Sequence, residues 1–175
     1  MALATVRRAV AADVDALVRI QSDTWRAAYA QLVPTEAIAG LTGPAAREAW
    51  LAAVTAGGGY HVFVASEGEW TVGFCAAAHY GGGSGESLAE VSALLVEPRW
   101  GRRGHGGRLL AAAAEALRGH GARTGRAWVP EADAVSRAFF AHAGWEADGA
   151  VRGLDTGAGT LREVRLSGSL DLRLR

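Results

Sequence analysis

The apolar positions in the first third of the chain predict one strand followed by helices. Residues 3–10 carry a short apolar run that is typical of a strand. Apolar positions then recur at helical spacing over residues 13–32. A second helical stretch covers residues 34–41 and resumes over residues 44–55, where Pro44 suits the first turn of a helix.

Three apolar runs in the middle of the chain predict consecutive antiparallel strands. The first two runs, residues 60–65 and 70–80, are separated by the polar segment 66–69, which is typical of a hairpin. A glycine-rich loop at residues 81–85 leads into the third run, residues 88–96. We expect this third strand to lie beside the second.

The last third of the chain mixes helices and strands. A strong helical stripe covers residues 109–120, a short strand covers residues 126–129, and a helix covers residues 133–143. Two C-terminal strands occupy residues 151–167 around a turn at residues 157–159. This order favours an α+β fold over a doubly wound parallel sheet.

Composition limits the class of protein. A chain of 175 residues predicts a single domain over residues 1–175 that can bury a core without disulfides. The single cysteine, Cys75, lies in an apolar strand and is expected to be a core residue. With 18 basic and 18 acidic residues, the net charge is zero, which argues against a nucleic-acid partner.

Two further absences in the sequence shape the expectations. No apolar run is long enough to span a bilayer and the N-terminus does not resemble a signal peptide, so we expect a cytoplasmic protein without a membrane partner. The five histidines do not stand at the spacings of metal ligands. We therefore expect no metal.

The segment after the third middle strand predicts an anion site. It joins Pro98, a turn rich in glycine and arginine, and the start of a helix, whose first amides have no acceptor within the helix. Gly104 and Gly106 allow an anion to approach the backbone, and four nearby arginines add forked donors: Arg99, Arg102, Arg103 and Arg108.

The same turn is open to other interpretations. A solvated tight turn explains glycines and arginines equally well. A P-loop is excluded because the chain has no lysine. A dinucleotide fingerprint with Gly104, Gly106 and the later Glu131 remains open but is disfavoured, because it expects a parallel βαβ unit.

The chain resembles the GNAT superfamily, the acyl-CoA-dependent N-acyltransferases. Residues 91–110 resemble the strand, pyrophosphate loop and helix that are most diagnostic of the family. Residues 6–13 and 25–34 resemble one bacterial branch, and residues 128–145 resemble the next strand, helix and closing strand. The resemblance implies a twisted, mixed and mostly antiparallel sheet of about seven strands, flanked by about four helices, with a splayed strand pair that holds CoA.

The resemblance also implies contacts to acetyl-CoA, which would act as a cosubstrate. The diphosphate would lie on the loop amides of Arg102, Arg103, Gly104, His105, Gly106 and Gly107. The pantetheine arm would pair with the backbone edge of Leu94, Leu95 and Val96, where strand 88–96 splays from strand 125–129. Further contacts would come from Asp133, Ser136, Phe139 and Phe140.

Three positions depart from the family pattern. Gly101 stands where the loop normally begins with Gln or Arg, so Arg102 or Arg103 would have to substitute. Asp133 stands where Asn is frequent, and Phe140 stands where many relatives carry a Tyr proposed as general acid. Losing that acid slows transfer without forbidding it, because a thiol with a pKa of about 8.5 leaves readily as thiolate.

Glu90 is the candidate base, although a solvated charge at a strand end is an equal alternative. An amine with a pKa of about 10.4 is protonated at pH 7, a handicap of about 3.4 units or roughly 4.6 kcal/mol, so a proton acceptor matters. Strict alternation would place Glu90, Ser92 and Leu94 on one face and Val91, Ala93 and Leu95 on the other.

The expected acceptor site is aromatic. The candidates for its wall are Trp25, Tyr29, His79 and Tyr80, although core packing or an exposed strand end also explains them. We expect an N-acetyltransferase that moves the acetyl group of acetyl-CoA to a primary amine of a small molecule or peptide by direct single displacement. The alternative is a catalytically degenerate acyl-CoA-binding regulatory module, and a homodimer paired through the C-terminal strands stays open.

Overall fold

The computed structural model describes residues 3–81 and 87–172. Residues 82–85 of the predicted glycine-rich loop therefore lie outside the described residues. Within the described part, seven strands form one sheet in the order β1-β2-β3-β4-β5-β7-β6. Their bounds are β1 Ala4–Arg8, β2 Tyr60–Glu67, β3 Trp70–Gly81, β4 Ser87–Val96, β5 Thr124–Pro130, β6 Glu146–Asp155 and β7 Thr160–Ser169.

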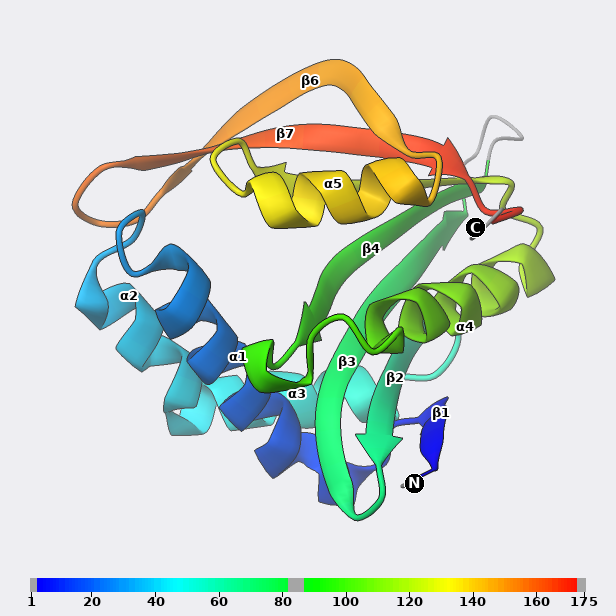
Figure 1. The fold of residues 1–175 in the computed structure, drawn as a ribbon, viewed down its shortest axis with the longest axis horizontal. Helices are drawn as coiled ribbons and strands as arrows, with labels where there is room; N and C mark the ends of the chain where they lie inside the picture. Colours follow the sequence, from blue (N-terminus) through cyan, green and yellow to red (C-terminus); the bar gives the residue numbers. More distant parts are fainter. Residues whose placement is uncertain (1–2, 82–86, 173–175) are drawn as a thin grey trace.

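Five α-helices and three short 3-10 helices complete the described chain (Figure 1). The α-helices are α1 Val14–Tyr29, α2 Thr35–Ala39, α3 Pro44–Thr55, α4 His105–Gly119 and α5 Ala134–His142, and the 3-10 helices are η1 Ala11–Asp13, η2 Gly40–Thr42 and η3 Pro98–Trp100. The prediction of an α+β fold is confirmed. The predicted second helical stretch is divided into α2 and α3, which raises the count from about four helices to five.

The helices cover both faces of the sheet and create two main cores. On one face, α4 contacts β2, β3 and β4, and its stripe of Leu109, Leu110 and Leu117 is fully buried. On the other face, α1 and α3 contact the same strands around Phe74, which lies at the centre of the second core. Figure 1 shows α5 lying along β7 at the other end of the sheet.

The sheet forks between β4 and β5. These two strands are parallel, whereas every other neighbouring pair is antiparallel. Among the described residues, they pair only over Ala89, Glu90 and Val91 with residues 125–127. Beyond this point β4 stays with β3 as far as Val96, and β5 stays with β7 as far as Pro130. The predicted splayed strand pair is confirmed.

A β-bulge at Ser92 overturns the predicted alternation along β4. Across the β3–β4 pair, Ala77 lies opposite Val91 and Ala76 lies opposite Ala93, so Ser92 is the extra residue. Val91 therefore packs in the α4 core with Leu94 and Val96, whereas Ala93 and Leu95 pack in the α1 core. The expectation that Val91 shares a face with Ala93 and Leu95 was wrong, because one inserted residue reverses the sides that follow.

Strand β6 begins at Glu146, five residues before the predicted start at residue 151. It is an edge strand and almost all its residues are exposed, so it lacks a buried face that would create alternation. Its register with β7 also shifts between Ala147 and Val151, where Gly149 has a φ of +92°. The irregular pairing hides the start of this strand in the sequence.

A hydrogen bond ties α1 to α5 across the open end of the fork. The Tyr29 hydroxyl donates to Asp133 Oδ2 at 2.6 Å, and Asp133 caps α5 by accepting from the Ser136 amide at 2.9 Å. A small core of Tyr29, Val33, Ile38 and Leu161 joins α1 and α2 to β7. The N-terminal helices are thus fastened to the C-terminal half of the sheet.

Trp145 packs against two glycines that lie opposite each other on β5 and β7. Gly125 lies opposite Gly168, and Trp145 is 1% exposed. A Cβ on Gly125 would lie 2.5 Å from Trp145 Cη2, and a Cβ on Gly168 would collide with the same indole. The Trp145 Nε1–H donates to Ser169 O at 3.1 Å, which fixes the ring in place.

We predict that Gly168→Ala lowers the free energy of unfolding by about 1–3 kcal/mol, because the added methyl overpacks Trp145. Gly119→Ala is the matched control, since a Cβ there meets nothing within 4 Å. The control should change stability by less than about 1 kcal/mol. Urea denaturation measures both variants, and equal midpoints for Gly168→Ala and the parent would refute the packing argument.

We predict that Tyr29→Phe lowers the free energy of unfolding by about 1–2 kcal/mol, because the Asp133 carboxylate loses the hydrogen bond that the Tyr29 hydroxyl donates. Tyr60→Phe is the control, since that ring is 51% exposed at the start of β2. The control should stay within about 0.5 kcal/mol of the parent. The same urea titrations report both values, and a stable Tyr29→Phe protein contradicts the proposed fastening.

Candidate functional site

The turn before α4 has the geometry of an anion site. Gly104 precedes the helix with a φ of +79°, a left-handed conformation that favours glycine, and Arg102 also has a positive φ of 61°. The Arg108 amide is the first to bond within the helix, to Gly104 O at 3.1 Å. The amides of residues 105–107 come before it and lie at the positive end of the helix dipole.

The side chains around this turn differ in whether they are engaged with other parts of the protein. A Cβ on Gly106 would lie 3.1 Å from Phe139 Cε2, so α4 begins in close contact with α5. The Arg108 guanidinium turns back toward Gly104, with Nη2 3.5 Å from the position of a Cβ there. The side chains of Arg103 and His105 instead bond to Glu67 at the end of β2. Backbone amides and the exposed Arg102 and Arg108 are the groups that remain for an anion.

A half-open cavity of about 220 Å³ lies in the fork. Seven of the residues selected from the sequence line it, namely Trp25, Tyr29, Glu90, Leu94, Leu95, Ser136 and Phe140. They come from α1, β4 and α5, so the structure brings together three distant parts of the chain. Phe139 and Val96 lie outside this lining, on the side of the α4 core.

Glu90 stands where the fork begins. It pairs with Arg126 on β5 and with Ala78 on β3, and its side chain is half-buried. Tyr80 lies two residues beyond Ala78 on the same face of the sheet. Burial, and then the charge of Glu90, raises the pKa of the Tyr80 hydroxyl. Glu90 and Tyr80 therefore share one mouth of the fork, although Tyr80 is not part of the cavity wall.

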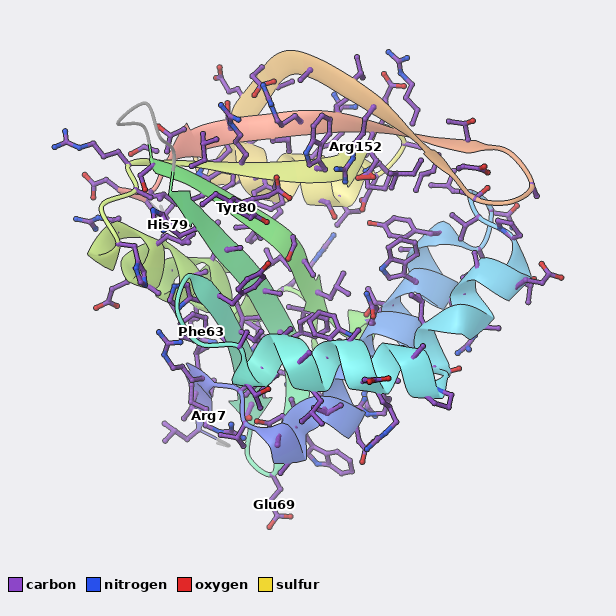
Figure 2. All side chains as sticks on the ribbon, turned by 180° about the vertical axis from the view of Figure 1, so that it is seen from behind. Arg7, Phe63, Glu69, His79, Tyr80 and Arg152 are labelled. Atoms are coloured by element: carbon purple, nitrogen blue, oxygen red, sulfur yellow. The ribbon has the colours of Figure 1, made fainter. Side chains whose placement is uncertain are left out.

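His79 lies elsewhere than the sequence analysis expected. Its ring stacks on His120 at 5.3 Å, and His120 lies 5.0 Å from His61. Its Nε2 contacts Ser87 Oγ. His79 and Tyr80 are adjacent in the chain (Figure 2). Their side chains lie on opposite faces of β3, because successive residues of a strand point to opposite sides of the sheet. The geometry does not place His79 in the acceptor cleft.

Among the described residues that line the cavity, Phe140 carries no acidic proton and the Tyr29 hydroxyl is engaged with a carboxylate. Phe140 stacks on Trp145 with ring centroids 5.2 Å apart. Tyr29 lines the same cavity, but its proton is shared with Asp133, and burial followed by that carboxylate raises the pKa of the hydroxyl above its ordinary range. Asp133 and Ser136 are occupied in capping α5.

One polar wall of the cavity consists of residues that the sequence did not indicate. Arg152 on β6 pairs with the buried Glu163 on β7 at 3.3 Å and lies over the Trp128 ring at 4.4 Å. All three line the cavity together with Gln21 of α1. Arg152 and Glu163 are directly opposite in the β6–β7 register, which their sequence positions alone do not reveal. Figure 2 shows Arg152 on the C-terminal hairpin.

Within residues 3–81 and 87–172, no three His, Cys, Asp or Glu side chains are grouped so that they could hold a metal ion. In the same part of the chain, no helix has both the length and the apolar character needed to cross a bilayer.

Solved structures share this fold. PaiA N-acetyltransferase from Thermoplasma acidophilum, in complex with coenzyme A, has a TM-score of 0.80 and 16% identity, and the match covers 95% of this chain and 99% of that chain. The ribosomal-protein-alanine N-acetyltransferase from Brucella melitensis has a TM-score of 0.74 and 21% identity over 94% and 99% of the two chains.

A third structure also contains the expected donor. It is yncA from Salmonella typhimurium with its cofactor acetyl-CoA, with a TM-score of 0.65, 22% identity, and coverage of 96% and 94%. At such identities these likenesses concern the fold. No curated protein matches the sequence.

A family model supplies the decisive comparison. The model of the acetyltransferase (GNAT) family matches residues 15–145, which includes α1, the forked strands, the turn before α4, and α5. The match agrees with the mixed sheet and with the fork between β4 and β5. The chain therefore belongs to the GNAT N-acetyltransferase family.

Proposed function

We propose that this protein transfers the acetyl group of acetyl-CoA to a primary amine of a small molecule or peptide. The observation that carries the proposal is the free edge of β4 beyond Val91, which runs from the cavity to the anion-binding turn before α4. An extended thioester with a diphosphate at one end matches these two features in order. Acetyl-CoA, when bound, supplies the activated acetyl thioester.

The chain offers contacts along the whole donor. We assign the diphosphate to the amides of residues 102–107 at the start of α4. We assign the pantetheine arm to the β4 edge at residues 94–96, where Leu94 and Leu95 line the cavity together with Ser136 and Phe140 of α5. Phe139 is assigned to the donor from the side of the α4 core, against which Val96 also packs. The fork provides unpaired backbone groups there, which an amide-containing arm can satisfy.

Glu90 is assigned to accept the proton of the incoming amine, directly or through water. An amine with a pKa of about 10.4 must lose this proton before it can attack. The amine nitrogen then attacks the thioester carbonyl in a single displacement, so that the C–N bond forms, the C–S bond breaks and CoA leaves as thiolate. The nitrogen loses its second proton in this step, to solvent water or to the departing thiolate. Phe140 supplies no proton to that thiolate, which has a pKa near that of cysteine, about 8.5.

The acceptor is assigned to the mouth of the cavity opposite the donor. Trp25 and Tyr29 form one wall with their rings at 5.0 Å in an edge-to-face arrangement, and Tyr80 stands beside Glu90. Arg152 and Glu163 close the far wall. These groups combine apolar surface with charges of both signs, as a small polar amine requires.

A second candidate function follows from Phe140. A protein that binds acyl-CoA without transferring the acyl group would retain the fork and the turn, but it would have no need of a proton donor at this position. Such a regulatory module predicts CoA binding without thiol release on any amine.

We predict that the parent protein binds acetyl-CoA with a micromolar or lower Kd and that Gly106→Val weakens this binding at least about tenfold. The added side chain would meet Phe139 at the start of α4. Gly119→Ala is the control at the far end of the same helix and should bind as the parent does. Isothermal titration measures all three, and no binding by the parent would rule out the proposed donor.

We predict that Glu90→Gln lowers kcat/KM for an accepted amine by about 10²–10⁴-fold at pH 7. The loss should shrink as the pH approaches the pKa of the amine, because fewer amine molecules then carry the extra proton. Glu69→Gln is the control, since this carboxylate projects from the tip of the β2–β3 hairpin (Figure 2). A panel of amines assayed for thiol release gives the rates.

Two results of that assay would redirect the assignment. Equal rates for Glu90→Gln and Glu69→Gln would move the base to another group. Binding of acetyl-CoA without turnover on any amine would favour the regulatory module.

A further inference from the structure

One carboxylate connects the β2–β3 hairpin to the turn before α4. Glu67 is the last residue of β2, and its Oε1 accepts from Arg103 Nη1 at 2.8 Å while its Oε2 accepts from His105 Nε2 at 2.9 Å. The two donors belong to the same turn and flank Gly104. Glu67 thus holds both sides of the residue whose left-handed backbone starts the helix.

The position of the His105 ring depends on this bond. The residue is 2% exposed, and its Nδ1 has no hydrogen-bond partner within the described residues. Because an ionised carboxylate only accepts, His105 Nε2 must carry the hydrogen. Without Glu67 both ring nitrogens would be buried without a partner, which is costly. The hydrogen bond to Glu67 therefore fixes the His105 ring, and with it the first residue of α4.

Arg103 is fixed from a second side. Its guanidinium lies 4.9 Å from the centroid of the Trp100 ring while it pairs with Glu67. The hydrogen bond from His105, and then the charge of Arg103, keeps the pKa of the Glu67 carboxyl below its ordinary value, in agreement with an ionised group. The positive charge of Arg103 is therefore matched by protein, and the side chain serves to shape the turn.

Glu67 lies far along the sheet from the candidate base. In the strand registers, Glu67 is opposite Trp70, whereas Glu90 is opposite Ala78 at the other end of β3. A change at Glu67 should consequently alter the turn and leave the mouth of the fork as it is. Because of this separation, an effect on binding of the diphosphate can be measured apart from an effect on the rest of the donor.

We propose that Glu67 is a positioning residue that holds the turn in the conformation in which the amides of residues 105–107 converge on the diphosphate of CoA. It acts through Arg103 and His105 and does not touch the donor itself. The inference rests on the proposed function, because it takes this turn as the diphosphate site.

The test compares two charge-neutralising variants of the same hairpin, Glu67→Gln and Glu69→Gln. A glutamine at 67 keeps the volume of the side chain. Its NH2 group, however, faces one of the two donors, Arg103 or His105, that bond to a carboxylate oxygen in the parent protein. We expect Glu67→Gln to raise the Kd for CoA about tenfold and Glu69→Gln to leave it unchanged. Calorimetry with CoA gives these constants.

Pantetheine, which lacks the diphosphate, is the second probe. Its Kd, followed by NMR titration, should be the same for the parent and Glu67→Gln, because the β4 edge is untouched. If Glu67→Gln does not fold, Glu67→Asp replaces it. This variant keeps the charge but withdraws it by one methylene, so the same selective loss for CoA is expected.

The outcomes separate this inference from the proposed function. If the parent does not bind CoA, both fail. If the parent binds CoA and Glu67→Gln binds it as Glu69→Gln does, only the positioning role fails. It also fails if CoA and pantetheine are weakened equally, since Glu67 would then act on the fold as a whole.

Discussion

The structure depends on the point at which β4 and β5 stop sharing hydrogen bonds. Their ladder covers three residue pairs and then opens, so each strand keeps a partner on one side only. An open edge inside a sheet costs free energy unless its polar groups find other partners. Here the neighbouring elements hold the edges apart, and the cavity occupies the space between them.

Each side of the fork has its own support. On the β5 side, the Gly125–Gly168 pair admits the Trp145 indole and β7 follows β5 to its end. On the β4 side, the bulge at Ser92 turns Ala93 and Leu95 toward α1. The bond from Tyr29 to Asp133 then joins α1 to α5. Packing and this hydrogen bond therefore support both sides of the opening.

The proposed anion site before α4 likewise depends on backbone groups that have no partner within the sheet or helix. In a chain of zero net charge, two of the four arginines around the turn pair with protein carboxylates, Arg103 with Glu67 and Arg99 with the buried Glu97 at 2.8 Å. Glu97 also accepts from Arg19, which ties the end of β4 to α1. Arg99 and Arg103 thus shape the turn, and the proposed anion contacts come from the helix amides together with Arg102 and Arg108.

The sequence by itself determined the element order, the α+β class and the turn with Gly104 before α4, because apolar periodicity and glycine conformation are local properties. The tertiary structure alone decided which face Leu94 and Leu95 occupy, since one bulged residue reverses a two-residue period. It also decided that Arg152 pairs with Glu163, that His79 stacks on His120 outside the cavity, and that His105 donates to Glu67. These contacts depend on strand register and on packing between distant segments, which no local pattern records.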